Sequence, residues 1–401
     1  MRMTRIAPTK AKESPVLTVD ERYELITRRQ GLFSPSTTPD TLKKLLQENP
    51  HPTIGWVTAP TGKPHIGYLV PLTKMVDFLR AGLKPIILYV DIYALLVNYV
   101  HPLPLITERL AYYRHLTTTV LTSLGVEEDE VTHIAESSYA YTEAFVKEFH
   151  KLIVLMKQTD AHCTSEVAQT DMLSPLLCAI HQSLGEVFVG MDIQFGGFDQ
   201  EDLFHHSVNF LPKIDQKPRE HIFNIMAPSL KSSSGHAKMS SSHAPDTKIE
   251  FLDDRETVNR KIQAADCPAR DISNANCVLS FLRDVIWPIS LLRVERLRGE
   301  VGYHKDEGCE LQPREQRPLT ALNGPTGTVF SIWSTEARQW VYYKDWKNLE
   351  EDFETGDVTP DDLKEAVGNW LNLILLPIRE AFRESEDWQA VEEKAYPGGL
   401  Y

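Results

Sequence analysis

The chain has 401 residues, of which 42% are hydrophobic, so it is long enough to form two domains with real cores. No apolar run reaches the length of a membrane span, and the N-terminus lacks the apolar core of a signal peptide. Five scattered cysteines indicate a reducing compartment, and we expect a cytoplasmic enzyme without a disulfide framework or structural metal.

The first fifty residues predict a lead and a helical appendage. Residues 1–20 are expected to be a disordered lead, and residues 21–50 to be helical, with Asp20 as the N-cap. The appendage belongs to a catalytic domain that we expect to extend over residues 21–246.

A strand, a turn, a helix and a second strand follow. Residues 53–59 and 85–90 are β-branched and apolar, as in buried parallel strands, and residues 60–64 form the turn between strand and helix. Gly82 supplies the helix stop. The helix is indicated by apolar residues at helical spacing: Leu69, Leu72, Val76 and Leu79. This order predicts a right-handed nucleotide-binding unit.

The turn brings His65 to the start of the helix. Free N–H groups and the helix dipole favour a phosphate there, and His65 can donate a hydrogen bond to a phosphate oxygen. Gly67 leaves room for adenine and ribose to lie against the backbone. The alternative is a chance Pro-His pair in a loop before an ordinary α/β helix.

A second motif lies in the Ser- and Lys-rich loop from Lys231 to His243. By composition alone this loop could be a flexible linker. A mobile loop that carries Lys238 can instead close over a triphosphate and neutralise the charge that develops as pyrophosphate leaves. Ser240, Ser241 and Ser242 add donors. The two motifs together predict an ATP-dependent adenylating enzyme.

A third segment, residues 189–200, carries a family resemblance together with residues 61–65 and 70–75. These segments resemble the eukaryotic cytosolic branch of class I tyrosyl-tRNA synthetases, over roughly residues 20–396. The resemblance implies an α/β fold: a Rossmann-like parallel-sheet catalytic domain with a helical insertion at about 101–182, followed by a mostly α-helical domain.

The resemblance also implies roles for individual residues. Thr58 and His65 would contact the α-phosphate, and Lys238 with Ser240, Ser241 and Ser242 would bind the leaving pyrophosphate. Gly197 and Asp199 would hold the ribose, and Met226 would lie near the adenine. Gln182 and Gln200 would contact the amino and carboxylate groups of the amino acid. ATP with Mg²⁺, an aromatic amino acid and tRNA are the implied ligands, and a homodimer without membrane contact is the implied assembly.

Five positions depart from the family pattern. Gly55 stands where the family has a tyrosine that binds the phenolic hydroxyl of the substrate, and Gly185 stands where it has the second partner, an aspartate. Cys178 replaces a tyrosine near the amino group, Ala140 a glutamine and Tyr93 a histidine. All five would line the amino-acid pocket.

Loss of the tyrosine and the aspartate removes the polar groups that distinguish a phenol from a bare ring. It also removes side-chain volume, which leaves a void unless something larger fills it. We therefore expect a bulkier, para-substituted tyrosine as the substrate. The alternative is that other side chains refill the space and tyrosine is still used. A dead pseudo-enzyme conflicts with the intact His65, Asp199, Gln200 and Lys238.

Residues 247–396 are expected to form the helical, anticodon-binding-like domain, with an insertion at 302–327 and a last helix that begins at the cap Thr359-Pro360. Residues 253–300 contain as many acidic as basic residues, and the whole chain carries a net charge of −14, so a tRNA surface is only weakly indicated. A tRNA ligase, housekeeping or inhibitor-resistant, therefore competes with a biosynthetic enzyme that passes the adenylate to another acceptor. A non-catalytic binding paralogue is the third alternative.

Overall fold

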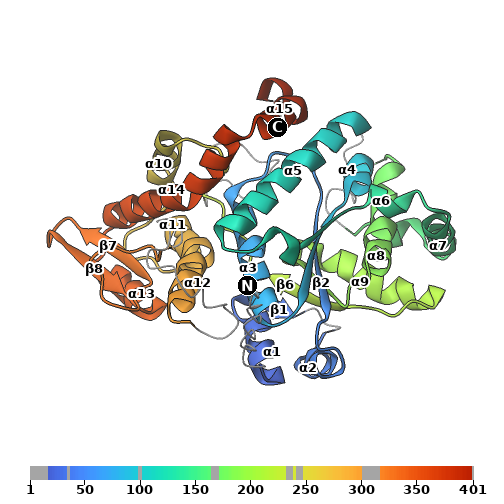
Figure 1. Ribbon diagram of the computed structural model, residues 1–401, viewed down its shortest axis with the longest axis horizontal. Coiled ribbons are helices and arrows are strands. Elements are labelled where there is room, and N and C mark those ends of the chain that lie inside the picture. The colour runs from blue at the N-terminus through green and yellow to red at the C-terminus, as the bar shows by residue number, and fades with distance from the viewer. Residues whose placement is uncertain are drawn as a thin grey trace, which may run out of the picture.

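The computed structural model describes residues 17–33, 37–97, 102–163, 171–231, 238–240, 247–299 and 317–399. Its centre is a six-stranded sheet, part of which is labelled in Figure 1. The strand order is β1-β6-β5-β2-β3-β4. The strands are β1 (Gln30–Phe33), β2 (Thr53–Thr58), β3 (Lys84–Tyr89), β4 (Thr132–Ala135), β5 (Ile193–Gly197) and β6 (Glu220–Asn224). Strands β2 to β6 pair in parallel, which confirms the predicted α/β fold, and β1 adds an antiparallel edge.

The sheet is buried on both faces, as its nearly continuous apolar strands predict. Alternate residues of β2 point to opposite sides: Ile54 and Trp56 lie in the large core, whereas Val57 lies in a smaller cluster. Helices α3 (Leu69–Arg80) and α5 (Leu103–Ser123) supply the large core. The opposite face is covered by α4 (Asp91–Val97), α8 (Cys178–Phe188) and α9 (Glu201–Phe210).

The N-terminal appendage consists of α1 (Val19–Thr27) and α2 (Pro39–Glu48), with β1 between them. The expected N-cap is wrong by two residues. Thr18 caps α1, because its Oγ1 accepts a hydrogen bond from the Glu21 N–H at 3.2 Å while the Glu21 carboxylate accepts from Thr18 N–H at 2.7 Å. Asp20 lies in the first turn and pairs with Lys43 across to α2.

The expected insertion at 101–182 contains helices, but it also contributes to the sheet. Strand β4 lies within it and pairs in parallel with β3, so α5 is the crossover helix between them. Within the expected insertion, only the segment after β4 interrupts the alternation of strands and helices that builds the sheet. It includes α6 (Ser137–Ala140) and α7 (Glu143–Ile153).

The C-terminal part is mostly helical, as predicted, with one β-hairpin. Its elements are α10 (Arg255–Gln263), α11 (Cys277–Phe281), α12 (Trp287–Leu297), β7 (Phe330–Ser334), β8 (Gln339–Tyr343), α13 (Trp346–Thr355), α14 (Pro360–Glu384) and α15 (Glu386–Ala395). A π turn at Leu282–Ile286 joins α11 to α12. Most of the expected insertion at 302–327 lies outside the described residues.

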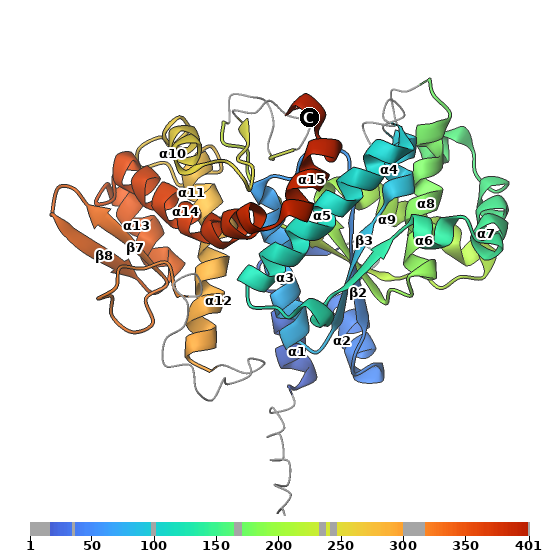
Figure 2. The same ribbon diagram turned by 45° about the horizontal axis from the view of Figure 1, so that its top comes forward.

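Helix α14 begins at Thr359 as expected, since its side chain accepts a hydrogen bond from Asp362 N–H at 3.2 Å. It is not the last helix, because Ser385 ends it and caps α15, accepting from Trp388 N–H at 3.1 Å. Figure 2 shows α15 turned back against α5 of the catalytic domain. No helix within the described ranges is both long and apolar enough to cross a bilayer.

Candidate active site

The carboxyl end of β2 carries the first group of expected site residues. Thr58 is the last residue of the strand, and its Oγ1 lies 3.3 Å from the Tyr68 hydroxyl. Burial raises the pKa of Tyr68, whose hydroxyl also bonds to that of Tyr113 at 3.3 Å. The turn between strand and helix is therefore lined by neutral hydroxyl groups.

His65 caps the short 3-10 turn that leads into α3. Its Nδ1 accepts a hydrogen bond from Gly67 N–H at 3.1 Å, so the proton of the neutral ring lies on Nε2. Ile66 N–H bonds to Ile249 O at 2.9 Å, which fixes the turn to the start of the C-terminal part. A Cβ at position 67 would lie 2.6 Å from the His65 ring, so this position requires glycine.

The end of β5 carries the second group. A Cβ at Gly197 would lie 2.3 Å from Asp199 Oδ1 and 2.5 Å from Met226 Sδ. Glycine therefore lets the expected ribose-binding and adenine-binding side chains meet over the backbone. Lys238 reaches the same place, where its Nζ forms an ion pair with the Asp199 carboxylate.

Backbone pairing fixes the position of Lys238. Lys238 forms an antiparallel bridge with Pro228, and Met239 N–H bonds to Ala227 O at 3.0 Å. Residues 238–240 of the Ser- and Lys-rich loop thus lie beside Ala227 and Pro228, the two residues that follow Met226. Ser240 is included, whereas Ser241 and Ser242 lie outside the described residues.

The expected amino-acid pocket begins at Gly55 in the middle of β2. Gly55 pairs with Gln194 of β5. Because their strand neighbours point into the large core, both positions lie on the opposite, α8 side of the sheet. The space over Gly55 is filled, because a Cβ there would lie 2.2 Å from Met191 Sδ. Met191 packs in one cluster with two of the expected pocket residues, Tyr93 and Cys178.

Gly185 lies on α8, one turn after Gln182. A Cβ there would lie 3.2 Å from both the Tyr139 hydroxyl and Leu88 Cδ2. Tyr139 packs against the same cluster as Met191. Ala140 packs with Phe145 and Ile180 in a second cluster, which Tyr139 also contacts, and the side chain nearest to Gly185 from this helix is that of Tyr139.

Several buried amides near the expected amino-acid pocket lack a hydrogen-bond partner. Among the described residues, Gln182 Nε2, Gln200 Oε1 and both amide atoms of Gln194 are buried without a hydrogen-bond partner. Gln194 is 0% exposed. An unsatisfied buried amide costs about 1–3 kcal/mol, so three of them together indicate a ligand with polar groups. Gln200 lies over Gly196, where a Cβ would be 2.7 Å from its Oε1.

Comparison with known proteins identifies the family. A family model described as class I tRNA synthetases (W and Y) matches residues 47–376. Tyrosine–tRNA ligase, cytoplasmic, of Saccharomyces cerevisiae is 32% identical over 392 residues, which is 96% of this chain and 90% of the relative. This chain belongs to the class I tRNA synthetase family.

Other relatives of this synthetase agree with that assignment. The cytoplasmic tyrosine–tRNA ligase of Gallus gallus is 34% identical, and the match covers 94% of this chain but only 63% of the relative. The solved tyrosyl-tRNA synthetase of Archaeoglobus fulgidus, complexed with L-tyrosine, has a TM-score of 0.71 at 24% identity, covering 91% and 99% of the two chains. That of Pyrococcus horikoshii has a TM-score of 0.75 at 18% identity, covering 94% and 99%. These two structures establish the shared fold.

Three residues of this synthetase site were not singled out from the sequence: Gln194, Met191 and Tyr139. Gln194 could have been found, because a polar residue in the middle of a buried apolar strand requires a partner. The other two carry no such signal. Met191 lies over Gly55, which is far from it in the sequence, and Tyr139 of α6 lies beside Gly185 of α8. Local sequence patterns do not reveal either contact.

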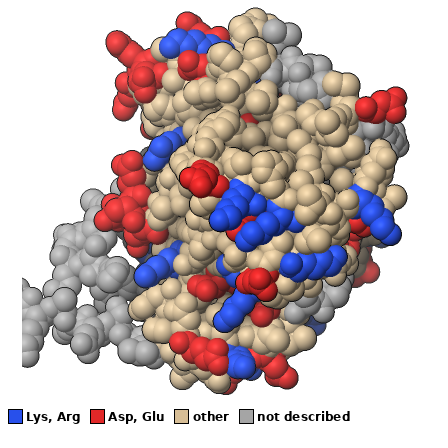
Figure 3. Space-filling model, turned by 90° about the vertical axis from the view of Figure 1, so that its right-hand side faces the viewer, with Lys and Arg blue, Asp and Glu red and all other residues tan. Residues whose placement is uncertain are grey.

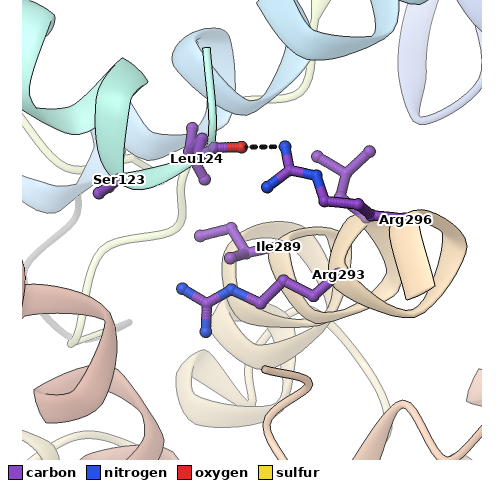
Figure 4. A pocket seen from close by; sticks show the side chains of 6 residues that line it. Ser123, Leu124, Ile289, Arg293 and Arg296 are labelled. Carbon is purple, nitrogen blue, oxygen red and sulfur yellow. Dashed lines mark hydrogen bonds between the residues drawn. The ribbon is translucent and has the colours of Figure 1, made fainter. Parts of the chain in front are cut away.

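Two further features lie outside the synthetase site. Figure 4 shows a small hollow between α5 and α12, lined by Ile289 and Arg293, where Arg296 donates a hydrogen bond to Leu124 O at 2.6 Å.

Within the described ranges, no group of three or more His, Cys, Asp or Glu side chains could hold a metal ion. We therefore assign no residue to Mg²⁺.

Proposed function

We propose that this synthetase activates an aromatic amino acid with ATP and transfers it to tRNA in the cytoplasm, as its named relatives do. One observation carries the proposal. The imidazole of His65 and the Asp199–Lys238 ion pair come from segments far apart in the chain and lie at the carboxyl ends of β2 and β5, and unpaired buried amides lie on β5, on α8 and just after β5. Ligands of parallel α/β sheets bind at this edge.

The residues suit a two-step reaction that needs no covalent protein intermediate. The amino-acid carboxylate oxygen attacks the α-phosphorus of ATP, the bond to the β-phosphate breaks, and pyrophosphate leaves. Lys238 would exchange Asp199 for this pyrophosphate and stabilise its charge. The tRNA hydroxyl then attacks the carbonyl carbon, and AMP leaves. Mg²⁺ would enter with ATP, bound to its phosphates.

The amino acid is the finer part of the proposal. We infer a tyrosine extended at the para position, because neither Gly55 nor Gly185 offers a polar group to a free phenol. Met191 now fills the space over Gly55. Its unbranched thioether can change rotamer at little cost, so an extended substrate would displace it. If Met191 stays in place, the refilled pocket suits tyrosine itself.

The test is amino-acid-dependent ATP–pyrophosphate exchange with tyrosine, phenylalanine, tryptophan, O-methyltyrosine and larger para-substituted tyrosines. Exchange with an aromatic amino acid is expected, and absence of exchange with every one would overturn the proposed activity. Lys238→Ala should lower the exchange rate about 10²–10³-fold. The exposed Lys44 provides the control, since Lys44→Ala should leave the rate unchanged.

The acceptor is decided in a second step. Release of AMP that depends on added tRNA is expected, and would support a tRNA ligase. AMP release without tRNA, in the presence of a small-molecule acceptor, would favour the biosynthetic alternative. If the enzyme charges tRNA with tyrosine at a normal rate, and a tyrosine-like inhibitor does not lower that rate, the result would instead indicate an inhibitor-resistant synthetase.

We also propose a homodimer formed through α7 and its neighbours. Large apolar side chains are exposed there, including Val146 (41%), Val154 (78%) and Leu173 (73%). Figure 3 looks onto this side of the molecule, much of which is uncharged. Exposed apolar surface of this kind marks an interaction site. Analytical ultracentrifugation should give a dimer for the wild type and a monomer for Val154→Asp, and a monomeric wild type would contradict the assembly.

A further inference from the structure

A buried hydroxyl without a partner points at the amino-acid pocket. The Tyr139 hydroxyl is shielded from solvent and forms no hydrogen bond with any described residue. It lies 3.2 Å from the place where a Cβ at Gly185 would be, beside Leu88. Gly185 is one turn from Gln182, whose buried amide nitrogen also lacks a partner. The hydroxyl and the amide therefore belong to one incomplete polar site.

The ring of Tyr139 is held firmly by its surroundings. It stacks on Phe188 with ring centroids 5.8 Å apart and contacts Phe145 at 5.7 Å. The start of α6 is anchored by the fully buried Glu136, whose carboxylate accepts from Tyr93 N–H at 2.8 Å and lies 2.7 Å from His181 Nδ1. A group fixed in this way is preorganised for a ligand, because little freedom is lost on binding.

The hydroxyl is a donor under all physiological conditions. Burial, with smaller contributions from the carboxylates of Glu136 and Asp91, raises the pKa of Tyr139 well above its ordinary value. A neutral phenol can donate a hydrogen bond as well as accept one, whereas a carboxylate at position 185 could only accept. The pocket can therefore bind an aromatic ring that carries an acceptor and no donor.

We propose that Tyr139 is a specificity-determining residue whose hydroxyl donates a hydrogen bond to an oxygen at the para position of the bound aromatic amino acid. The substrate class is thus a para-oxygenated phenylalanine, with the ether oxygen of an O-alkylated tyrosine as the favoured acceptor. This inference depends on the proposed function, in that it assumes that the pocket binds an aromatic amino acid.

The test compares O-methyltyrosine with 4-ethylphenylalanine, which has the same shape but a methylene in place of the ether oxygen. Exchange kinetics and calorimetric binding are measured with both amino acids on the wild type and on Tyr139→Phe. We expect the wild type to prefer O-methyltyrosine in kcat/KM and in Kd by roughly tenfold, the value of one hydrogen bond. Tyr139→Phe should abolish this preference and leave 4-ethylphenylalanine unaffected.

A matched control separates recognition from folding. Tyr343 also has a buried ring and a hydroxyl that donates to Asp352 at 2.9 Å, but it lies in the C-terminal hairpin. Tyr343→Phe should retain the preference. An equal loss for both amino acids in Tyr139→Phe would show a structural role and overturn the inference, as would an unchanged preference.

The binding measurement keeps the two proposals apart. Binding with the expected preference, but without exchange with any amino acid of the panel, would refute the proposed activity and support the role of Tyr139. Exchange without the preference would support the activity and refute the role of Tyr139. If neither amino acid binds to the wild type, the inference about Tyr139 is wrong.

Discussion

At the scale of single residues, two glycines create space in the pocket and two distant side chains fill it. Met191 is 1% exposed and lies directly over Gly55, where its side chain would clash with any Cβ placed there. The pocket volume thus depends on a flexible side chain that follows the αL residue Gly190. Removing this side chain should enlarge the pocket without touching a polar group.

We predict that Met191→Ala increases kcat/KM for para-extended tyrosines relative to tyrosine, measured by ATP–pyrophosphate exchange. The same change should lower the free energy of unfolding by about 2–5 kcal/mol, because it removes buried volume. Met75 is equally buried on the other face of the sheet. Met75→Ala should cost similar stability without changing specificity, and an equal shift in both variants would contradict a role of Met191 in the pocket.

At the scale of elements, α15 supports the turn that precedes His65. Lys63 in this turn pairs with Glu392 of α15, and the Tyr396 hydroxyl donates to Gly62 O at 3.1 Å. Arg109 of α5 donates both to Thr61 O and to Ala395 O. The C-terminal helix α15, the crossover helix α5 and the turn before His65 therefore form one unit, although they are far apart in the chain.

We predict that Glu392→Gln raises the KM for ATP severalfold, because the turn loses a charged contact at Lys63 that is largely shielded from solvent. The melting temperature should change little, since a single partly exposed pair contributes on the order of 1 kcal/mol. Its exposed neighbour is the control: Glu393→Gln should leave the KM unchanged. Equal KM values in both variants would show that α15 does not affect ATP binding.

At the scale of the whole molecule, a buried ionic cluster joins the catalytic and C-terminal parts. Glu295 of α12 accepts from Arg28, which follows α1, and from Arg80 of α3 at 2.6 Å. Asp77 also pairs with Arg28, and the surrounding cations hold its pKa below the usual range despite its burial. Such clusters depend on complete pairing, because removal of one partner leaves a buried charge uncompensated.

We predict that Glu295→Ala lowers the free energy of unfolding by about 3–5 kcal/mol in urea denaturation. The exposed pair of Glu48 with Lys44, at 3.8 Å, is the control. Glu48→Ala should change stability by less than about 1 kcal/mol. A small effect of Glu295→Ala would mean that the two parts are held together by their shared apolar core alone.

The stability of the whole molecule should also depend on acidity. Burial lowers the pKa of His206 to about 4, from an ordinary value of 6.5. Between these pH values the unfolded chain binds the proton and the folded chain does not, so stability falls as the pH falls through this window. Urea denaturation at pH 7 and pH 5 should show the loss, and His206→Gln should show a smaller one. The exposed His51 is the control, as His51→Gln should retain the wild-type dependence.

Much of the fold could be predicted because its signals are local. The apolar strand before the turn, the helical spacing after it and the cap at Thr359 all depend on residues close in sequence, and the structure confirms each element. Strand β1, the place of β4 in the sheet and the final helix α15 were not predicted. Each depends on pairing with distant segments, such as β6 or α5, which local patterns do not encode.

The candidate site divides in the same way. The sequence by itself determined the family and the parallel strands β2 and β3, and it predicted the roles proposed here for His65, Asp199 and Lys238, because motif residues keep their local geometry. Only the tertiary structure decided what surrounds the two glycines. A missing side chain says nothing about its replacement, since close packing lets any distant residue of suitable shape enter the space. Met191 and Tyr139 occupy it here, and by our proposal they set the shape and polarity of the amino-acid pocket.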